Sequence, residues 1–307
     1  MIWTLGIVAL LALGGWLAFQ YAVARNGPAV IDTIDRLAGT ERKVALVERA
    51  VIGDAPAQKL AVYRSQETEG TLPVILFVHG GSWRAGDPDD YGFVARALAP
   101  EGFVVVLAGY RLHPDALYPD MLEDTAGAIA WTKANIARHG GDPAHIVLAG
   151  HSAGAYNVVM TALDRQWLGR EGLGSGDIAG VIGLAGPYDF YPFDSDSTKA
   201  SFGEAPRPEE TQPITYARAD APPLLLMTGE QDTTVKPRNT RALAQAVGAE
   251  GGPVATRFYP ETDHSDILLA LASPWRHNRR VLDPVVEFAR DPDAFIRTSV
   301  PVQGETR

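Results

Sequence analysis

A serine flanked by small residues lies near the middle of the sequence, in Gly150-His151-Ser152-Ala153-Gly154. The apolar run 145–149 before it predicts a buried strand, and the small residues 153–163 after it predict a helix. A serine on such a sharp strand-to-helix turn exposes its hydroxyl, and flanking glycines relieve crowding there. The first N–H groups of the helix, beginning at Ala153, can stabilise an oxyanion. The pattern predicts a nucleophile at Ser152.

A second glycine-rich segment, His79-Gly80-Gly81-Ser82-Trp83, follows the predicted strand 72–78. Glycines let the backbone approach a substrate carbonyl, so the N–H groups of Gly81 and Ser82 are predicted to form the oxyanion hole with Ala153. Trp83, and Tyr188 farther along the chain, are predicted to line the substrate pocket. The alternative interpretation is a plain turn in which His79 and Trp83 have structural roles.

A serine hydroxyl is a weak nucleophile that needs a general base, and the base needs a group to orient it. His264 follows the last predicted strand, which would place it at the same edge of the sheet as Ser152. Asp232 follows the predicted strand 223–227 and precedes His264 in the chain, so it is the predicted orienting acid. Glu230 is the main alternative for the acid, and Asp189 is the next.

The elements that must position these residues are strands and helices that alternate from about residue 43. The predicted strands are 44–52, 60–64, 72–78, 103–108, 145–149, 178–184, 223–227 and 254–259. Helices are predicted at 93–98, 153–163, 239–247 and 281–289, another opens at Tyr118-Pro119, and a short one runs from Pro28 through Leu37. This alternation predicts an α/β fold with a mostly parallel, doubly wound sheet and helices on both faces. Residues 190–221 break it and are predicted to be a short lid-like or pocket-forming insertion in the catalytic domain 44–307.

The N-terminal residues 1–24 carry no charged side chain and predict a hydrophobic helix. A single membrane anchor is the favoured interpretation, on an undetermined side of the membrane, with residues 25–43 as a stalk. A cleavable signal peptide with export is the main alternative, because Ala22-Val23-Ala24 fits a cleavage pattern. A buried core helix is the third interpretation.

The composition excludes several classes of function. The chain has no cysteine, which excludes disulfides, thiolate metal sites and cysteine nucleophiles. Its net charge of −10 and its lack of a basic stripe argue against nucleic-acid binding. No metal or organic cofactor is expected, because a serine, a base, an acid and backbone donors suffice for the chemistry.

The segments HGGSW, GHSAG, GEQDTTV and the region around His264 occur in the order found in α/β-hydrolases. Across residues 44–290 the chain resembles the hormone-sensitive-lipase-like esterases, the esterases that cleave acetyl and feruloyl esters, and the kynurenine formamidases. The stretch Tyr110-Arg111-Leu112-His113-Pro114 is similar to the Y-R-L-x-P segment of such esterases. Ser82 replaces the third glycine of the HGGG motif, and the segment around Asp232 lacks the longer acidic motif. Ser82 narrows the pocket but keeps its backbone N–H, and the missing acidic motif favours the acetyl and feruloyl branch.

The resemblance implies hydrolysis of carboxylic esters through an acyl-enzyme on Ser152, with His264 as base and Asp232 as orienter. The expected partner is a small-molecule ester with a small or medium acyl or aryl group. Amide or formamide hydrolysis by the same residues is the alternative. A non-catalytic, membrane-tethered binding protein on a hydrolase scaffold is the third hypothesis.

Overall fold

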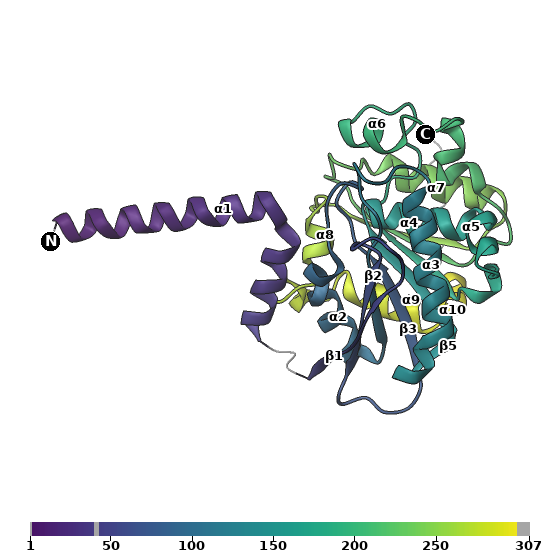
Figure 1. Ribbon diagram of the computed structural model, residues 1–307, viewed down its shortest axis with the longest axis horizontal. Helices are drawn as coiled ribbons and strands as arrows, with labels where there is room; N and C mark the ends of the chain where they lie inside the picture. The colour runs from purple at the N-terminus through teal and green to yellow at the C-terminus, as the bar shows by residue number, and fades with distance from the viewer. Residues whose placement is uncertain (1, 40–42, 300–307) are drawn as a thin grey trace.

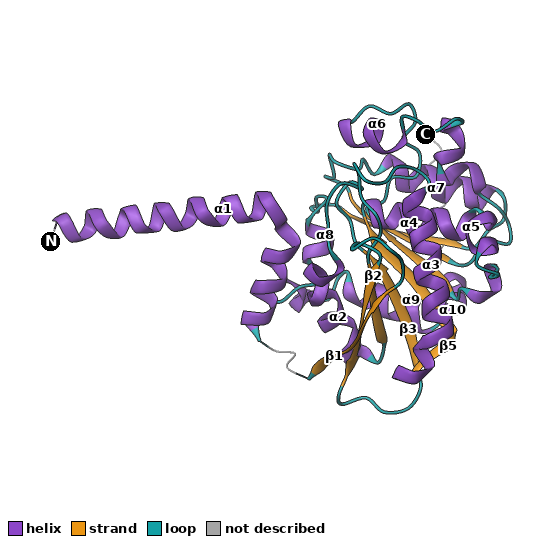
Figure 2. Cartoon of the chain, in the orientation of Figure 1, coloured by secondary structure: helices purple, strands orange, loops and turns teal. Residues whose placement is uncertain are grey.

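The computed structural model describes residues 2–39 and 43–299, with side chains described from residue 13 onward. Its centre is a twisted sheet (Figure 2). The sheet has eight strands, in the spatial order β1-β2-β4-β3-β5-β6-β7-β8. The strands are β1 (Val44–Val51), β2 (Lys59–Ser65), β3 (Leu72–Val78), β4 (Val104–Ala108), β5 (Gly141–His151), β6 (Gly180–Leu184), β7 (Leu224–Gly229) and β8 (Val254–Tyr259). β2 is antiparallel to both of its neighbours, and all the other pairs are parallel.

Two apolar cores lie on the two faces of this sheet, because successive side chains of a strand point to opposite faces. In β3, Val74, Leu76 and Val78 belong to one core, while Ile75 and Phe77 belong to the other. Strands β3, β4, β6 and β7, and residues 146–151 of β5, are buried on both faces and are therefore mostly apolar runs rather than alternating ones.

Helices cover both faces of the sheet (Figure 1). The core that contains Val74 is completed by α3 (Asp120–Asn135), α4 (Ala153–Leu163), α5 (Arg165–Arg170), α6 (Asp196–Phe202) and α7 (Arg238–Ala249). The core that contains Ile75 is completed by α2 (Gly92–Leu98), α8 (Asp266–Leu269), α9 (Leu282–Arg290) and α10 (Pro292–Thr298). The predicted α/β sheet with helices on both faces is confirmed.

The short helices α5, α8 and α10 were not among the predicted elements. Each has at most seven residues, too few for a helical apolar period to stand out. Two of them begin at an aspartate whose side chain caps the first turn: Asp164 accepts a hydrogen bond from the N–H of Gln166, and Asp291 from that of Ala294.

The connection between β6 and β7 contains the predicted insertion 190–221. It forms α6 and two short turns of helix at residues 208–211 and 213–216. Phe202 of α6 is fully buried, and the Tyr156 hydroxyl of α4 donates a hydrogen bond to the Thr211 carbonyl at 2.9 Å. The insertion therefore packs on α4, the helix that follows Ser152.

Helix α1 (Ile2–Ala38) has a kink at Asn26, whose backbone is non-helical (φ −154°, ψ 80°). The Asn26 side chain accepts a hydrogen bond from the Ala29 N–H at 3.2 Å, which is an N-cap for the second half of the helix. It also donates to Asp90 at 2.7 Å, before α2. The first half extends away from the rest of the molecule (Figure 1).

The second half of α1, residues 27–38, packs on the α/β domain although it falls in the predicted stalk. Asp32 and Asp35 form ion pairs with Arg96 of α2, each at 2.5 Å. Asp35 also accepts hydrogen bonds from the Ser273 N–H at 2.7 Å and from Arg276 at 3.3 Å, and its side chain is 1% exposed. These buried charges fix the segment to the domain. Residues 40–42 of the predicted stalk lie outside the described residues.

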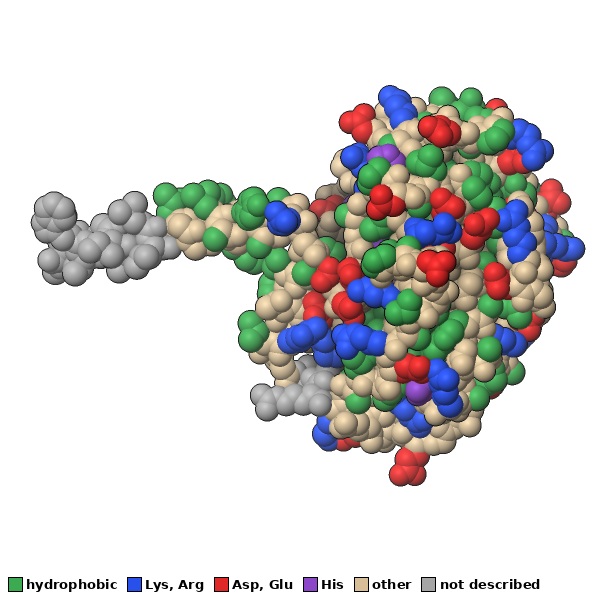
Figure 3. Space-filling view, in the orientation of Figure 1, with side chains coloured by type: hydrophobic (Ala, Val, Ile, Leu, Met, Phe, Trp, Pro, Cys, Tyr) green, Lys and Arg blue, Asp and Glu red, His purple; other side chains and the backbone are tan. Residues whose placement is uncertain are grey.

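Among the residues that the structure describes, no helix is both long and apolar enough to cross a membrane. Residues 1–12 of the predicted anchor lie outside the part whose side chains are described, so the anchor stays a prediction. Between residues 13 and 23 of α1, the large apolar side chains are exposed (Figure 3), for example Trp16 at 57% and Tyr21 at 65%.

Candidate active site

The carboxyl ends of parallel strands meet at one edge of the sheet, and ligands of open α/β folds bind at that edge. Ser152 directly follows β5, Asp232 follows β7 and His264 follows β8. The glycine-rich segment 79–83 follows β3, which pairs with β5 up to Val78 and Gly150. All the segments for which chemistry is predicted therefore converge on this edge.

Ser152 occupies the tight turn between β5 and α4, with a left-handed backbone (φ 55°, ψ −121°). The turn fits only because small residues surround it: a Cβ atom on Gly154 would lie 2.1 Å from the Val78 carbonyl oxygen. The Ser152 N–H donates to the Leu184 carbonyl at 2.8 Å, which fixes the turn to β6. The strained conformation at this position is the kind found where a fold holds a reactive side chain.

A chain of hydrogen bonds joins the serine, the histidine and the aspartate. His264 Nε2 lies 2.9 Å from Ser152 Oγ, and His264 Nδ1 lies 2.7 Å from Asp232 Oδ2. The other carboxylate oxygen, Asp232 Oδ1, accepts hydrogen bonds from the N–H groups of Thr234 and Val235 at 2.9 and 2.8 Å. Because the buried carboxylate accepts from Nδ1–H, Nε2 is free to accept the serine proton.

The two alternative acids lie elsewhere. Glu230 forms an ion pair with Arg241 of α7 at 2.6 Å. Asp189 is held through its backbone, where its N–H donates to Asn239 Oδ1 at 2.9 Å. The structure thus brings Asp232, and neither alternative, into contact with His264.

The segment 79–86 forms a tight loop beside Ser152. Gly81 has a φ of 118°, and a Cβ atom there would lie 2.0 Å from the Ala85 carbonyl oxygen, so only glycine fits. Ser82 and Trp83 are also left-handed, at φ 56° and 57°. Ser82 and Ala153 line the cavity at Ser152, whereas Gly81 is not one of its lining residues. The structure therefore brings two of the three predicted donors to the cavity wall.

Two buried histidines support this edge of the sheet. His151 Nε2–H donates to the His264 carbonyl at 3.0 Å, and the two rings lie 4.9 Å apart. Burial, with a smaller contribution from His264, lowers the pKa of His151 to about 3. His79 Nδ1–H donates to the Gly80 carbonyl at 2.7 Å, and burial lowers its pKa to about 4. Both rings are therefore neutral at pH 7 and act as hydrogen-bond donors that fix the loops.

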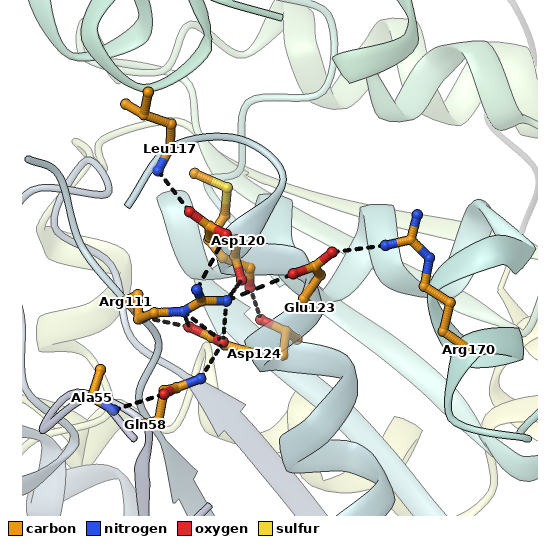
Figure 4. Close-up of polar contacts among 10 residues, drawn as sticks. Ala55, Gln58, Arg111, Leu117, Asp120, Glu123, Asp124 and Arg170 are labelled. Atoms are coloured by element: carbon orange, nitrogen blue, oxygen red, sulfur yellow. Dashed lines mark hydrogen bonds and ion pairs between the residues drawn. The ribbon is translucent and has the colours of Figure 1, made fainter. Parts of the chain in front are cut away.

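The loop between β4 and α3 supports the glycine-rich segment from the other side. The ring of Tyr110 stacks on His79 at 4.6 Å, and the His113 N–H donates to the Trp83 carbonyl at 2.8 Å. Arg111 holds this loop on α3 through the buried carboxylate of Asp124, which accepts from its backbone N–H at 2.7 Å and from its guanidinium (Figure 4). The segment 110–114 singled out in the sequence thus has a positioning role.

A cavity of about 420 Å³ opens at Ser152. Trp83 and Phe190 contribute its aromatic wall, and Trp83 Nε1–H donates to Asn157 Oδ1 at 3.0 Å. Tyr188, also predicted to line the pocket, does not reach it. Its ring is fully buried and fills the space that Gly183 and Gly186 leave open. The remaining lining residues include the polar residues Asp194, Ser195, Ser197, Thr198, Thr233, Thr234, Lys236, Arg238 and Asn239.

The polar half of the cavity was not predicted from the sequence. Residues 233–238 directly follow Asp232 after β7, and this position alone could have indicated that they lie near the active site. Phe190 to Thr198 belong to the insertion, which the sequence predicts to be lid-like or pocket-forming without indicating which of its residues line the pocket. No group of His, Cys, Asp or Glu side chains within the described residues could hold a metal ion.

The sheet order and the Ser152–His264–Asp232 contacts define an α/β-hydrolase. Residues 60–247, more than half of the chain, match the family model BD-FAE. The chain belongs to the BD-FAE family of α/β-hydrolase esterases.

Curated relatives agree with this assignment. The chain is 31% identical to esterase LipC of Mycobacterium tuberculosis over 76% of its own length and 61% of that protein. It is 26% identical to isoprenylcysteine alpha-carbonyl methylesterase ICME of Arabidopsis thaliana, over 83% of its length and 65% of that protein. The chain thus spans less than two thirds of the length of these relatives.

Solved structures share the fold. Esterase B from Lactobacillus rhamnosis matches with a TM-score of 0.74 at 20% identity, covering 94% of this chain and 96% of that one. Thermogutta terrifontis esterase 2, phosphonylated by sarin, matches with a TM-score of 0.63 at 21% identity, covering 79% and 92%.

Proposed function

We propose that the protein hydrolyses carboxylic esters through an acyl-serine intermediate on Ser152. The observation that carries this proposal is the continuous hydrogen-bonded chain from Asp232 Oδ2 through His264 to Ser152 Oγ, at the wall of a cavity. Membership of the BD-FAE family supports it. Hydroxyl nucleophile, base and orienting acid are the three parts that acyl transfer requires.

In the first half of the reaction, Ser152 Oγ attacks the ester carbonyl and His264 Nε2 takes its proton. The resulting oxyanion is stabilised by backbone N–H groups, for which Ser82 and Ala153 at the cavity wall are the candidates and Gly81 is the adjacent third. One such donor typically contributes about 10²- to 10³-fold in rate. His264 then returns the proton to the leaving alcohol, and the acyl group stays on Ser152.

In the second half, water attacks the acyl-serine with His264 as base, and the acid is released. A cavity of about 420 Å³ is at the small end of ligand sites, which run from roughly 300 to 1,000 Å³. We therefore infer small or medium acyl or aryl esters as substrates. Amide or formamide hydrolysis uses the same groups, and relative rates on a matched ester and amide separate the two.

The test is labelling of the purified protein with a fluorescent fluorophosphonate, which reacts only with an activated serine. We expect the wild type to be labelled and Ser152→Ala to lose the label entirely, along with ester hydrolysis. Ser265→Ala is the matched control, because this exposed serine adjoins His264 in sequence but contacts neither Ser152 nor Asp232. Equal labelling of Ser152→Ala and wild type would refute the assignment, and an unlabelled, folded wild type would favour the non-catalytic hypothesis.

A further inference from the structure

Two cationic side chains, Lys236 and Arg238, line the same cavity as Ser152. Within the described part of the chain, neither side chain forms an ion pair or a hydrogen bond, and both residues are exposed. The next cation on α7 behaves differently, because Arg241 is paired with Glu230 at 2.6 Å. The two cations at the cavity are therefore available to a ligand.

The backbone that carries these cations is fixed to the catalytic residues. At one end, Asp232 Oδ1 accepts hydrogen bonds from Thr234 and Val235 while its other oxygen contacts His264. At the other end, the buried Asn239 donates to the Lys236 carbonyl at 3.2 Å. The positions of the cations relative to the triad are therefore set by the fold, which is a requirement for substrate selection.

The charge balance of the cavity is opposite to that of the protein. Among the described residues, its ionic lining consists of Lys236, Arg238 and one carboxylate, Asp194, whereas the whole chain has a net charge of −10. Helix α7, which is 12 residues long, also begins at Arg238, so its positive end adds to the potential there. An excess of positive charge beside a nucleophile favours an anionic substrate.

We propose that the substrate is an ester that carries a carboxylate group, and that Lys236 and Arg238 bind this carboxylate while Ser152 attacks the ester. The proposal rests on the proposed ester hydrolysis and names its substrate class. Thr233, Thr234 and Ser197 add hydroxyl groups to the same wall, where they can donate hydrogen bonds to the bound carboxylate. The negative charge of Asp194 repels an anion and therefore limits the affinity of the cavity for the carboxylate.

The experiment compares kcat/KM for esters matched in shape but not in charge. One pair places the charge on the alcohol side (para-acetoxybenzoate against para-acetoxybenzamide), and the other on the acyl side (para-nitrophenyl hemiadipate against para-nitrophenyl hexanoate). We expect the wild type to prefer the anion in at least one pair. In Lys236→Gln/Arg238→Gln this preference should fall by about 10-fold, which is the combined effect of two exposed charge pairs.

Two further variants sharpen the test. Asp194→Asn should raise the preference for the anion by about 3-fold, since it removes the opposing charge. Lys199→Gln should leave it unchanged, because Lys199 is an exposed cation of α6 that has no ion partner among the described residues and does not line the cavity. Raising the salt concentration should weaken the wild-type preference.

Failure of the inference differs from failure of the proposed function. If the wild type hydrolyses the neutral esters but prefers no anion in either pair, or if the double variant keeps the full preference, the carboxylate site is refuted. If the wild type hydrolyses no ester and takes no fluorophosphonate label, the proposed function itself fails. Fluorophosphonate labelling of each variant shows that its active site is folded.

Discussion

Single residues around the triad act mainly by holding the backbone of the catalytic loops in place through hydrogen bonds. His151 is the clearest case, because its neutral ring holds the carbonyl of His264 and packs against the ring of the base. A proton on His151 would add a buried charge beside His264, which explains the low pKa of about 3. The residue between the glycine and the serine of the motif thus connects the nucleophile turn with the loop of the base.

The depressed pKa of His151 predicts a pH-dependent stability. Below pH 6.5 the unfolded chain binds a proton at this residue, while the folded chain does not until about pH 3. The neutral His151 therefore lowers the free energy of unfolding by nothing above pH 6.5, and by a growing amount as the pH falls below that value. At pH 5 the loss from His151 is about 2 kcal/mol.

The measurement is urea denaturation of wild type and His151→Gln at pH 7 and pH 5. The glutamine amide can still donate to the His264 carbonyl but does not titrate. We expect the variant to lose about 2 kcal/mol less than the wild type between the two pH values. The same pH dependence in both proteins would show that His151 is protonated in the folded state. His79, with a pKa of about 4, also lowers the free energy of unfolding at pH 5, but it does so equally in the wild type and in His151→Gln and therefore cancels in the comparison.

At the scale of elements, the sequence was sufficient for the sheet and for most of the triad. Apolar runs identify the strands β3 to β7, and positions after strand ends predict that Ser152, His264 and an acid meet at one edge of the sheet. The choice of Asp232 over Glu230 and Asp189 needed the contact with His264 that the structure shows. The docking of α1 was not predictable, because Asp35 contacts Arg96 and Ser273, which are 61 and 238 residues away. Tyr188 was misplaced for a different reason: two neighbouring glycines, Gly183 and Gly186, leave space for its ring and so decide its orientation.

The buried carboxylate of Asp35 predicts how the second half of α1 is held. Asp35→Asn removes the charge that faces Arg96 and Arg276, and breaking a buried pair costs about 3 kcal/mol. We expect the amides of residues 27–38 to exchange hydrogen about 100-fold faster, measured by hydrogen–deuterium exchange, while the strands keep their protection.

Arg36→Gln is the matched control on the same helix. Arg36 pairs with Asp32 at 2.7 Å, but its side chain is 62% exposed, so its loss should cost less than about 1 kcal/mol. Equal exchange in the Asp35→Asn variant and the wild type would mean that apolar contacts, rather than the buried charges, hold the helix.

At the scale of the whole molecule, two surfaces differ in character. The visible face of the α/β domain interleaves acidic and basic side chains (Figure 3). The projecting part of α1 instead carries exposed apolar side chains, among them Leu13, Trp16, Leu17 and Tyr21. Apolar side chains gathered on a projecting helix are typical of a segment that contacts a membrane or another protein, and the sequence continues the uncharged run to residue 1.

We expect residues 1–24 to bind a lipid bilayer, with Trp16 and Tyr21 at the level of the headgroups. In flotation with phosphatidylcholine vesicles, the full chain should rise with the lipid, and a variant lacking residues 1–24 should stay at the bottom. Because Asp32 and Asp35 remain in that variant, its domain should stay folded and keep the fluorophosphonate label. If the full chain does not float, mass spectrometry of the expressed protein separates the remaining explanations. A mature chain that begins at Arg25 would show that residues 1–24 are a cleaved signal peptide and not an anchor. An intact chain that does not float would refute both the anchor and the signal peptide, and would indicate that these apolar side chains contact a protein partner.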